Sequence, residues 1–172
     1  MSRPPARRRL PWLAAALRLD SHGAQDRFIA RVRGRVLRLM QRGARVDRAP
    51  LEELEQMFRR QVGFMARNRE VPRRMLELAT GGDDGRIQRR IRKIVEQYEA
   101  RLARVIARGQ RVGLVRAAAE PHEEARLLVA LIRGLALRMR RESRSADWYD
   151  AEARRIFLAY QWRLRQSVNG EQ

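Results

Sequence analysis

The sequence predicts an all-α domain, and two features of the chain indicate this fold class. From Ala24 onward apolar residues recur at the helical spacing of three and four, and no segment alternates as a β-strand does. Prolines, glycines and acidic residues stand where they start or stop helices. The 172 residues, 44% of them hydrophobic, are enough for one core. We expect one six-helix domain over residues 24–167, between a basic arm (1–23) and a short tail (168–172).

The first three predicted helices each have one apolar stripe. The first helix ends near Gly43, and the third closes at the glycines 81–82. Between them a second helix opens at Pro50 and stops around Asn68, with two glutamates in its first turn, where the helix dipole favours acidic side chains. The three stripes consist of Phe28, Val32, Val36 and Leu39; of Leu51, Leu54, Phe58, Val62 and Met65; and of Met75, Leu76 and Ala79.

The remaining three predicted helices are longer. The fourth begins at a cap, Asp83 or Asp84, and continues for about 25 residues, or about 40 Å, to Gly109. A turn then leads to a fifth helix that opens at Pro121, and a sixth begins at Ser145 or Asp147. The apolar positions of the fourth are Ile87, Ile91, Ile94, Tyr98, Leu102 and Val105, and those of the sixth are Trp148, Ile156, Phe157, Tyr160 and Leu164.

The net charge of +19 comes almost wholly from arginine, since Lys93 is the only lysine. Such a charge attracts nucleic acid and anionic membranes. Arginine with abundant alanine is equally what a GC-rich genome encodes wherever a solvated cation is acceptable. Both explanations stay open, and no function is based on the charge alone.

The residue types that catalysis and metal binding need are sparse. Cysteine is absent, and the two histidines, His22 and His122, lie far apart in the sequence. Asp147, Asp150 and Glu152 cluster along the chain, but their spacing on a helix does not bring all three onto one ion. We therefore expect no enzyme, no metal and no cofactor.

The N-terminal segment is a poor export signal. Three arginines precede an apolar run, but the run is short, contains Pro11 and meets Arg18 and Asp20 without a convincing cleavage site. A poorly ordered basic arm is the preferred interpretation. No later segment approaches the ~20 uncharged residues that a membrane helix requires. We expect a cytoplasmic protein without membrane contact.

Residues 121–139 differ from the other helices because apolar side chains cover more than half of the helix circumference. A helix of this kind must be buried on two sides. Gly134 interrupts the ridge, at a cost of up to ~1 kcal/mol relative to alanine, which favours close backbone approach there. A four-helix interface in a homodimer explains both features, while burial at the centre of the monomer is the alternative. The expected interface residues are Leu128, Leu131, Gly134, Leu135, Ile156, Phe157 and Tyr160.

Several short motifs occur in a fixed order along the chain. The first is Phe58, Val62, Phe64 and Met65, followed by a break from Asn68 to Pro72. The others are Gly109, Gly113, Val115 and Arg116 in the turn, then Ala125, Leu127, Leu128, Leu131, Gly134 and Leu135. Together they resemble the C-terminal regulatory domain of TetR-family transcriptional repressors over roughly residues 24–165. The turn lacks the aspartates that are usual in that family.

The resemblance implies a homodimer whose last two helices form the interface, with a cavity in the preceding helices for a small, largely apolar effector. Effector binding would change the spacing of two N-terminal helix-turn-helix heads, which then leave operator DNA. Residues 1–23 are either the basic arm or a remnant of that head, and no recognition helix can be assigned in them. Either the head lies upstream or this is a relative without one, so operator DNA is a partner only where a head is present.

A pocket between the second, third and fourth helices would use Phe58, Val62, Met65, Met75, Tyr98 and Leu102. Methionine and aromatic side chains suit an adaptable apolar site, with the Tyr98 hydroxyl as a polar group. The alternative is that these side chains simply fill the core.

A second hypothesis is a basic helical protein that binds nucleic acid without sequence preference. Its working surface would be an arginine face of the long helix. That face consists of Arg86, Arg89, Arg90, Lys93, Arg101, Arg104 and Arg108.

Overall fold

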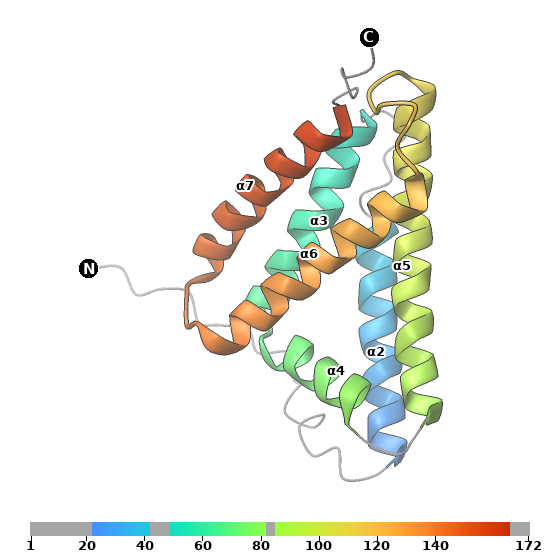
Figure 1. The fold of residues 1–172 in the computed structure, drawn as a ribbon. Coiled ribbons are helices and arrows are strands. Elements are labelled where there is room, and N and C mark those ends of the chain that lie inside the picture. Colours follow the sequence, from blue (N-terminus) through green and yellow to red (C-terminus); the bar gives the residue numbers. More distant parts are fainter. Residues whose placement is uncertain (1–21, 42–48, 82–84, 166–172) are drawn as a thin grey trace, which may run out of the picture.

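The computed structural model describes residues 22–41, 49–81 and 85–165. Across these residues the chain folds into six α-helices without a strand, which confirms the predicted all-helical class. The helices are α2 (His22–Gln41), α3 (Pro50–Arg67), α4 (Glu70–Thr80), α5 (Gly85–Arg111), α6 (Pro121–Arg141) and α7 (Ala146–Arg165) (Figure 1).

Some of the expected features lie outside the described residues. These are the basic arm as far as residue 21, the tail 168–172, the stop near Gly43 and the expected caps Asp83 and Asp84. Helix α2 already includes His22 and Gly23, which the sequence prediction places in the arm.

Local hydrogen bonds fix several helix ends. Asn68 closes α3, because its side-chain amide donates to the carbonyl of Phe64 at 2.8 Å. Of the two caps considered for α7, Ser145 is the one used, and its hydroxyl oxygen accepts from the Trp148 amide at 3.1 Å. The Glu120 carboxylate caps α6 in the same way, accepting the amide of the residue three positions on at 2.6 Å.

The helices form a wedge with a triangular front (Figure 1). Helix α5 runs along one side, α6 crosses back diagonally from the far end of α5, and α4 closes the triangle. Helices α2 and α3 lie behind this triangle, and α7 packs along α3. The Phe58 and Phe157 rings join α3 to α7 with centroids 6.0 Å apart. One hydrophobic core connects all six helices, but α4 contributes only Val71 as a buried residue.

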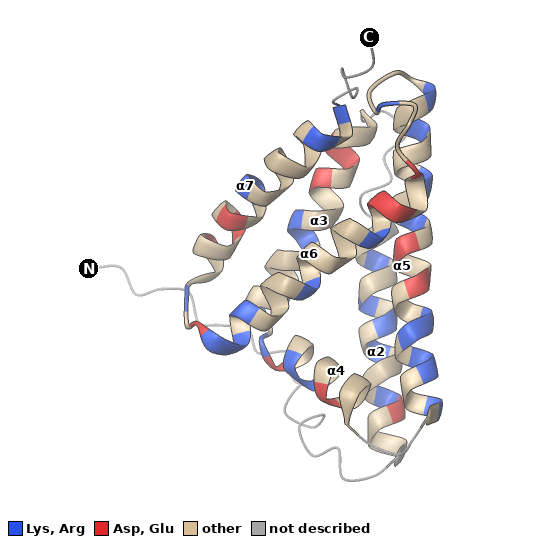
Figure 2. Cartoon of the chain, viewed as in Figure 1, with Lys and Arg blue, Asp and Glu red and all other residues tan. Residues whose placement is uncertain are grey.

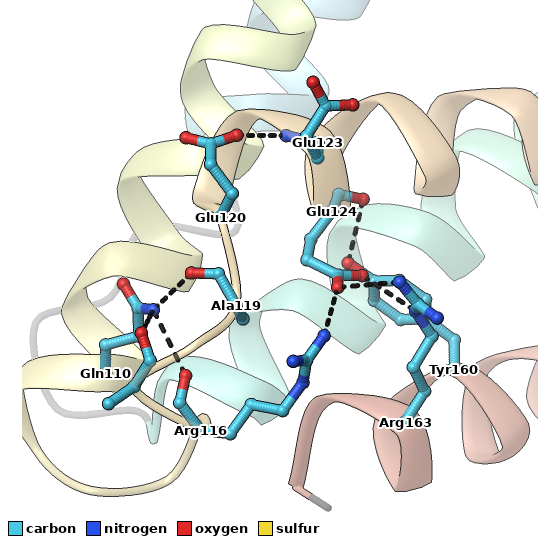
Figure 3. Close-up of polar contacts among 9 residues, drawn as sticks. Gln110, Arg116, Ala119, Glu120, Glu123, Glu124, Tyr160 and Arg163 are labelled. Atoms are coloured by element: carbon cyan, nitrogen blue, oxygen red, sulfur yellow. Dashed lines mark hydrogen bonds and ion pairs between the residues drawn. The ribbon is translucent and has the colours of Figure 1, made fainter. Parts of the chain in front are cut away.

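The α5–α6 turn needs glycine at two positions. Gly113 has φ of +72°, in the left-handed region that other residues rarely adopt. A Cβ on Gly109 would lie 2.8 Å from Cγ2 of Val115, so a side chain there would force the turn apart. The Gln110 side-chain amide donates to the carbonyls of Arg116 and Ala119 at 3.2 and 2.6 Å (Figure 3). These contacts hold the end of α5 at a fixed distance from the start of α6.

Candidate ligand-binding site

A cavity of about 540 Å³ lies between α2, α3, α4, α5 and α6. Its volume falls within the range usual for small-molecule sites. The lining residues are Val32 and Val36 from α2; Gln61, Phe64 and Met65 from α3; Val71, Pro72, Met75, Leu76, Ala79 and Thr80 from α4; Gln88, Ile91, Arg92, Ile94, Val95 and Tyr98 from α5; and Val129, Ile132, Arg133, Ala136 and Leu137 from α6.

The structure places half of the predicted pocket residues in this lining. Met65, Met75 and Tyr98 line the cavity. Phe58, Val62 and Leu102 do not, and each is completely buried. Placing those three in the pocket is wrong, because they lie on the part of the α3 and α5 stripes that packs into the core.

Sequence reasoning missed the contribution of α2 and α6. Val32 and Val36 lie on an α2 stripe that looks like any core stripe, and Val129 and Ile132 lie on the α6 face that was expected only to pack. No signal in the sequence marks these four residues, because a cavity-facing apolar side chain has the same periodicity as a core side chain.

The cavity has two polar groups in its interior. The Oε1 atom of Gln61 is buried and has no hydrogen-bond partner, although a buried acceptor normally has one. The Tyr98 hydroxyl donates to the carbonyl of Met57 over 3.5 Å, and burial raises the pKa of this phenol, so it stays neutral. Gln61 therefore brings a buried acceptor without a partner to the wall of a largely apolar space.

The edge of the cavity is basic. Arg92 of α5 and Arg133 of α6 both line it and are exposed, as are the lining residues Ala79, Thr80 and Leu137. The cavity reaches solvent along these residues. No aspartate or glutamate occurs among the described residues that line it. The carboxylates of α4, which covers one side, are bonded within that helix: Arg73 contacts Glu70 and Glu77.

The predicted dimer interface is only partly at the surface. Leu128, Leu135, Phe157 and Tyr160 are buried within the single chain, at 3% exposure or less. Assigning these four to an interface is therefore wrong, since they pack against α3 and the rest of the core. Leu131 and Ile156 are half-buried, and Gly134 is exposed.

Other side chains form the exposed apolar surface of α6 and α7. Leu127 and Leu137 of α6 are 36% and 47% exposed, and Leu158 and Trp162 of α7 are 62% and 65% exposed. We call these four residues, together with Leu131 and Gly134, the α6–α7 face. A Cβ built on Gly134 meets no atom within 4 Å, so nothing inside the chain requires glycine there.

A buried carboxylate joins α6, α7 and the α5–α6 turn (Figure 3). Glu124 is 2% exposed and accepts from Arg116 at 2.9 Å and from Arg163 at 3.1 Å. The Tyr160 hydroxyl donates to the Glu124 carbonyl at 3.0 Å, and burial, aided by the Glu124 charge, raises the pKa of that phenol. Glu124 lies in the first turn of α6, and no local pattern in the sequence indicates these contacts, because Tyr160 and Arg163 are distant in the chain.

A second buried carboxylate accounts for part of the arginine face on α5. Glu53, 1% exposed, binds Arg101 at 2.9 Å and also binds Arg108. Asp26 of α2 likewise binds Arg86, at 2.9 Å, and Arg90. Four of the seven cations proposed for nucleic acid are thus held by acidic side chains of neighbouring helices.

Basic residues occur on every helix drawn in Figure 2 and are not confined to α5. None of the described helices is long and apolar enough to cross a membrane. No protein-family model matches the sequence, and no curated protein matches it.

Proposed function

We propose that this chain is the small-molecule-sensing and dimerisation portion of a TetR-like transcriptional regulator. The observation that supports the proposal most directly is the apolar cavity of about 540 Å³ among five helices. Natural cores are close-packed, so a space of this size is unusual in a folded domain and calls for a functional explanation. Binding of a small, largely apolar effector provides this explanation.

The effector should bring a hydrogen-bond donor into the cavity. The buried Oε1 atom of Gln61 has no hydrogen-bond partner, and the Tyr98 hydroxyl is only weakly engaged at 3.5 Å. A hydroxyl or amide on the effector would relieve the cost of an unsatisfied buried acceptor, which is about 1–3 kcal/mol.

Decanol provides a test of the cavity, because it is apolar, uncharged and carries one donor. We expect decanol to raise the melting temperature of the protein, since a ligand that binds only the folded state stabilises it. Ala136→Leu places a larger side chain in the cavity, and we expect decanol affinity to fall at least about tenfold while the fold is retained. Ala100→Leu, on α5 outside the lining, is the matched control. Equal decanol affinity in the two variants would place the binding elsewhere.

The homodimer is the second part of the proposal, and the α6–α7 face supports it. Exposed leucines occur on α6, and Leu158 and Trp162 are exposed on α7, so both helices that the resemblance implicates carry exposed apolar side chains. Gly134 lies on this face, and its cost of up to ~1 kcal/mol is unexplained within one chain. Close approach of a second copy would explain it.

Substitution at Gly134 separates dimerisation from folding. Because a Cβ there meets nothing within 4 Å, Gly134→Leu should leave the protomer folded and slightly more stable, yet weaken the dimer about tenfold or more. Gly34→Leu, at a mid-helix glycine of α2, is the control for the change in helix propensity. Sedimentation at several protein concentrations measures the dimer constant. Identical dimers in both variants and the parent would remove Gly134 from the interface.

Regulation of transcription is the third part, and it rests on the resemblance. In a protein that carries a helix-turn-helix head, effector binding should release operator DNA. A gel-shift assay of such a protein on its own upstream DNA, with and without the effector, tests this step. Retention of the same DNA affinity at saturating effector would argue against a regulator that senses ligand.

A further inference from the structure

The charged side chains that line the cavity are all basic. Arg92 and Arg133, on helices that frame the opening, are the only charged residues in the described lining. Neither has a carboxylate partner among the described residues, whereas Arg86 and Arg90 on the other face of α5 share Asp26. Two guanidinium groups are therefore available at the entrance to an apolar space.

The surrounding acidic groups do not cancel these two cations. Helix α4 contributes to the cavity lining, and its Glu77 accepts from Arg73 and Arg74 at 2.8 Å each. Its Glu70 is bound by Arg73 at 2.6 Å. The hydrogen bond from Arg74 and the nearby arginines hold the pKa of Glu77 below its usual value, so this carboxylate stays ionised and engaged within α4. A cationic ligand would thus meet two arginines and no carboxylate among the described residues that line the cavity.

We propose that the effector is an amphipathic carboxylic acid, and this inference rests on the proposed ligand-sensing function. Its apolar body occupies the space among α2 to α6, and its carboxylate lies at the edge between Arg92 and Arg133. The planar guanidinium matches a carboxylate in geometry and is always charged. Exposure of both arginines lets the ligand anion keep part of its hydration, so the anion is not buried at a large cost.

Three probes with the same ten-carbon chain test the inference: decanoate, decanol and decyltrimethylammonium. We expect decanoate to bind about tenfold more tightly than decanol at low ionic strength, and the cation to bind most weakly. Added salt should reduce the advantage of decanoate, because the two arginines are exposed. Calorimetry on the whole chain gives the three dissociation constants.

A double variant assigns the effect to the two residues. Arg92→Gln with Arg133→Gln should abolish the tenfold advantage of decanoate over decanol. The melting temperature of the variant without ligand shows that it is folded. Arg89→Gln with Arg104→Gln removes the same charge from exposed positions of α5 outside the lining, and should keep the full advantage.

The outcomes distinguish this inference from the function on which it rests. The inference of an acidic ligand is wrong if decanol and decanoate bind equally. It is also wrong if the control double variant loses as much of the decanoate advantage as the Arg92–Arg133 double variant. In both cases the proposed apolar ligand site is retained. If the cation binds most tightly, the inference is likewise wrong. If none of the three probes binds, the ligand-sensing function itself is wrong.

Discussion

The two ends of the α5–α6 pair differ in how they are held together. At the end of α5 and the start of α6, buried Glu53 and Glu124 bind four arginines, and Gln110 fixes the connecting turn. At the start of α5 and the end of α6, the helices diverge around the cavity, and α4 covers them with a single buried residue, Val71. One end is clamped by charge-assisted hydrogen bonds, and the other is apolar and hollow.

This difference indicates which part of the domain can respond to a ligand. Regions with few buried apolar contacts open most easily, and α4 is such a region. A ligand that fills the cavity would add contacts at the hollow end, while the clamped end keeps α6 and α7 aligned. Movement of α4 relative to α5 and α6 is therefore the change that binding should produce.

Truncation of a core side chain should have the largest effect. Leu102 is completely buried and outside the cavity, so Leu102→Ala should lower the free energy of unfolding by about 3 kcal/mol. Leu76 of α4 is half-buried against space that is already empty, and Leu76→Ala should cost about 1 kcal/mol. Urea titration measures both. Similar losses at the two sites would mean that the hollow end is packed as tightly as the core.

The clamped end should be the next most sensitive. Glu124→Gln leaves the Arg116 guanidinium, whose side chain is 15% exposed, without its anion. We expect a loss of about 2 kcal/mol, below the ~3–5 kcal/mol typical of a broken buried pair, because Arg163 is half exposed. Glu123→Gln, one residue earlier with a side chain that is 66% exposed, should change stability by less than ~0.5 kcal/mol. Equal losses in the free energy of unfolding for the two variants, measured by urea titration, would show that the Glu124 ion pairs do not stabilise this end.

The smallest effect concerns the ion pair between α3 and α7. Two hydrogen bonds from Arg59 hold the pKa of Asp150 below its usual value. A carboxyl whose pKa is lower when folded adds stability above its unfolded pKa of about 3.9, and this stability is lost as the pH falls through the folded pKa. Asp150 is 44% exposed, so the contribution should be under ~1 kcal/mol.

Arg59→Gln removes this contribution and should flatten the fall in stability below about pH 5. Arg104→Gln, an exposed arginine of α5, should leave the slope as it is in the parent. Chemical unfolding at a series of acidic pH values provides the comparison. A parent and Arg59→Gln variant with superimposable pH profiles would show that Asp150 does not act through Arg59.

The sequence by itself determined the helices, because their signals are local. Apolar spacing, the proline at position 50 and the hydroxyl of Ser145 act over three or four residues, and all of them stand where the structure uses them. The turn glycines were also recognisable, since glycine adopts the left-handed backbone that such turns often need, as Gly113 does here.

Only the tertiary structure decided which apolar residues surround empty space and which fill the core. Phe58 and Met65 share one stripe of α3, yet the first is in the core and the second lines the cavity. Long-range charge pairing was equally hidden, because Glu124 meets Arg163 from 39 residues away. Helical periodicity gives the face of a side chain, but what lies opposite that face depends on the packing of other helices.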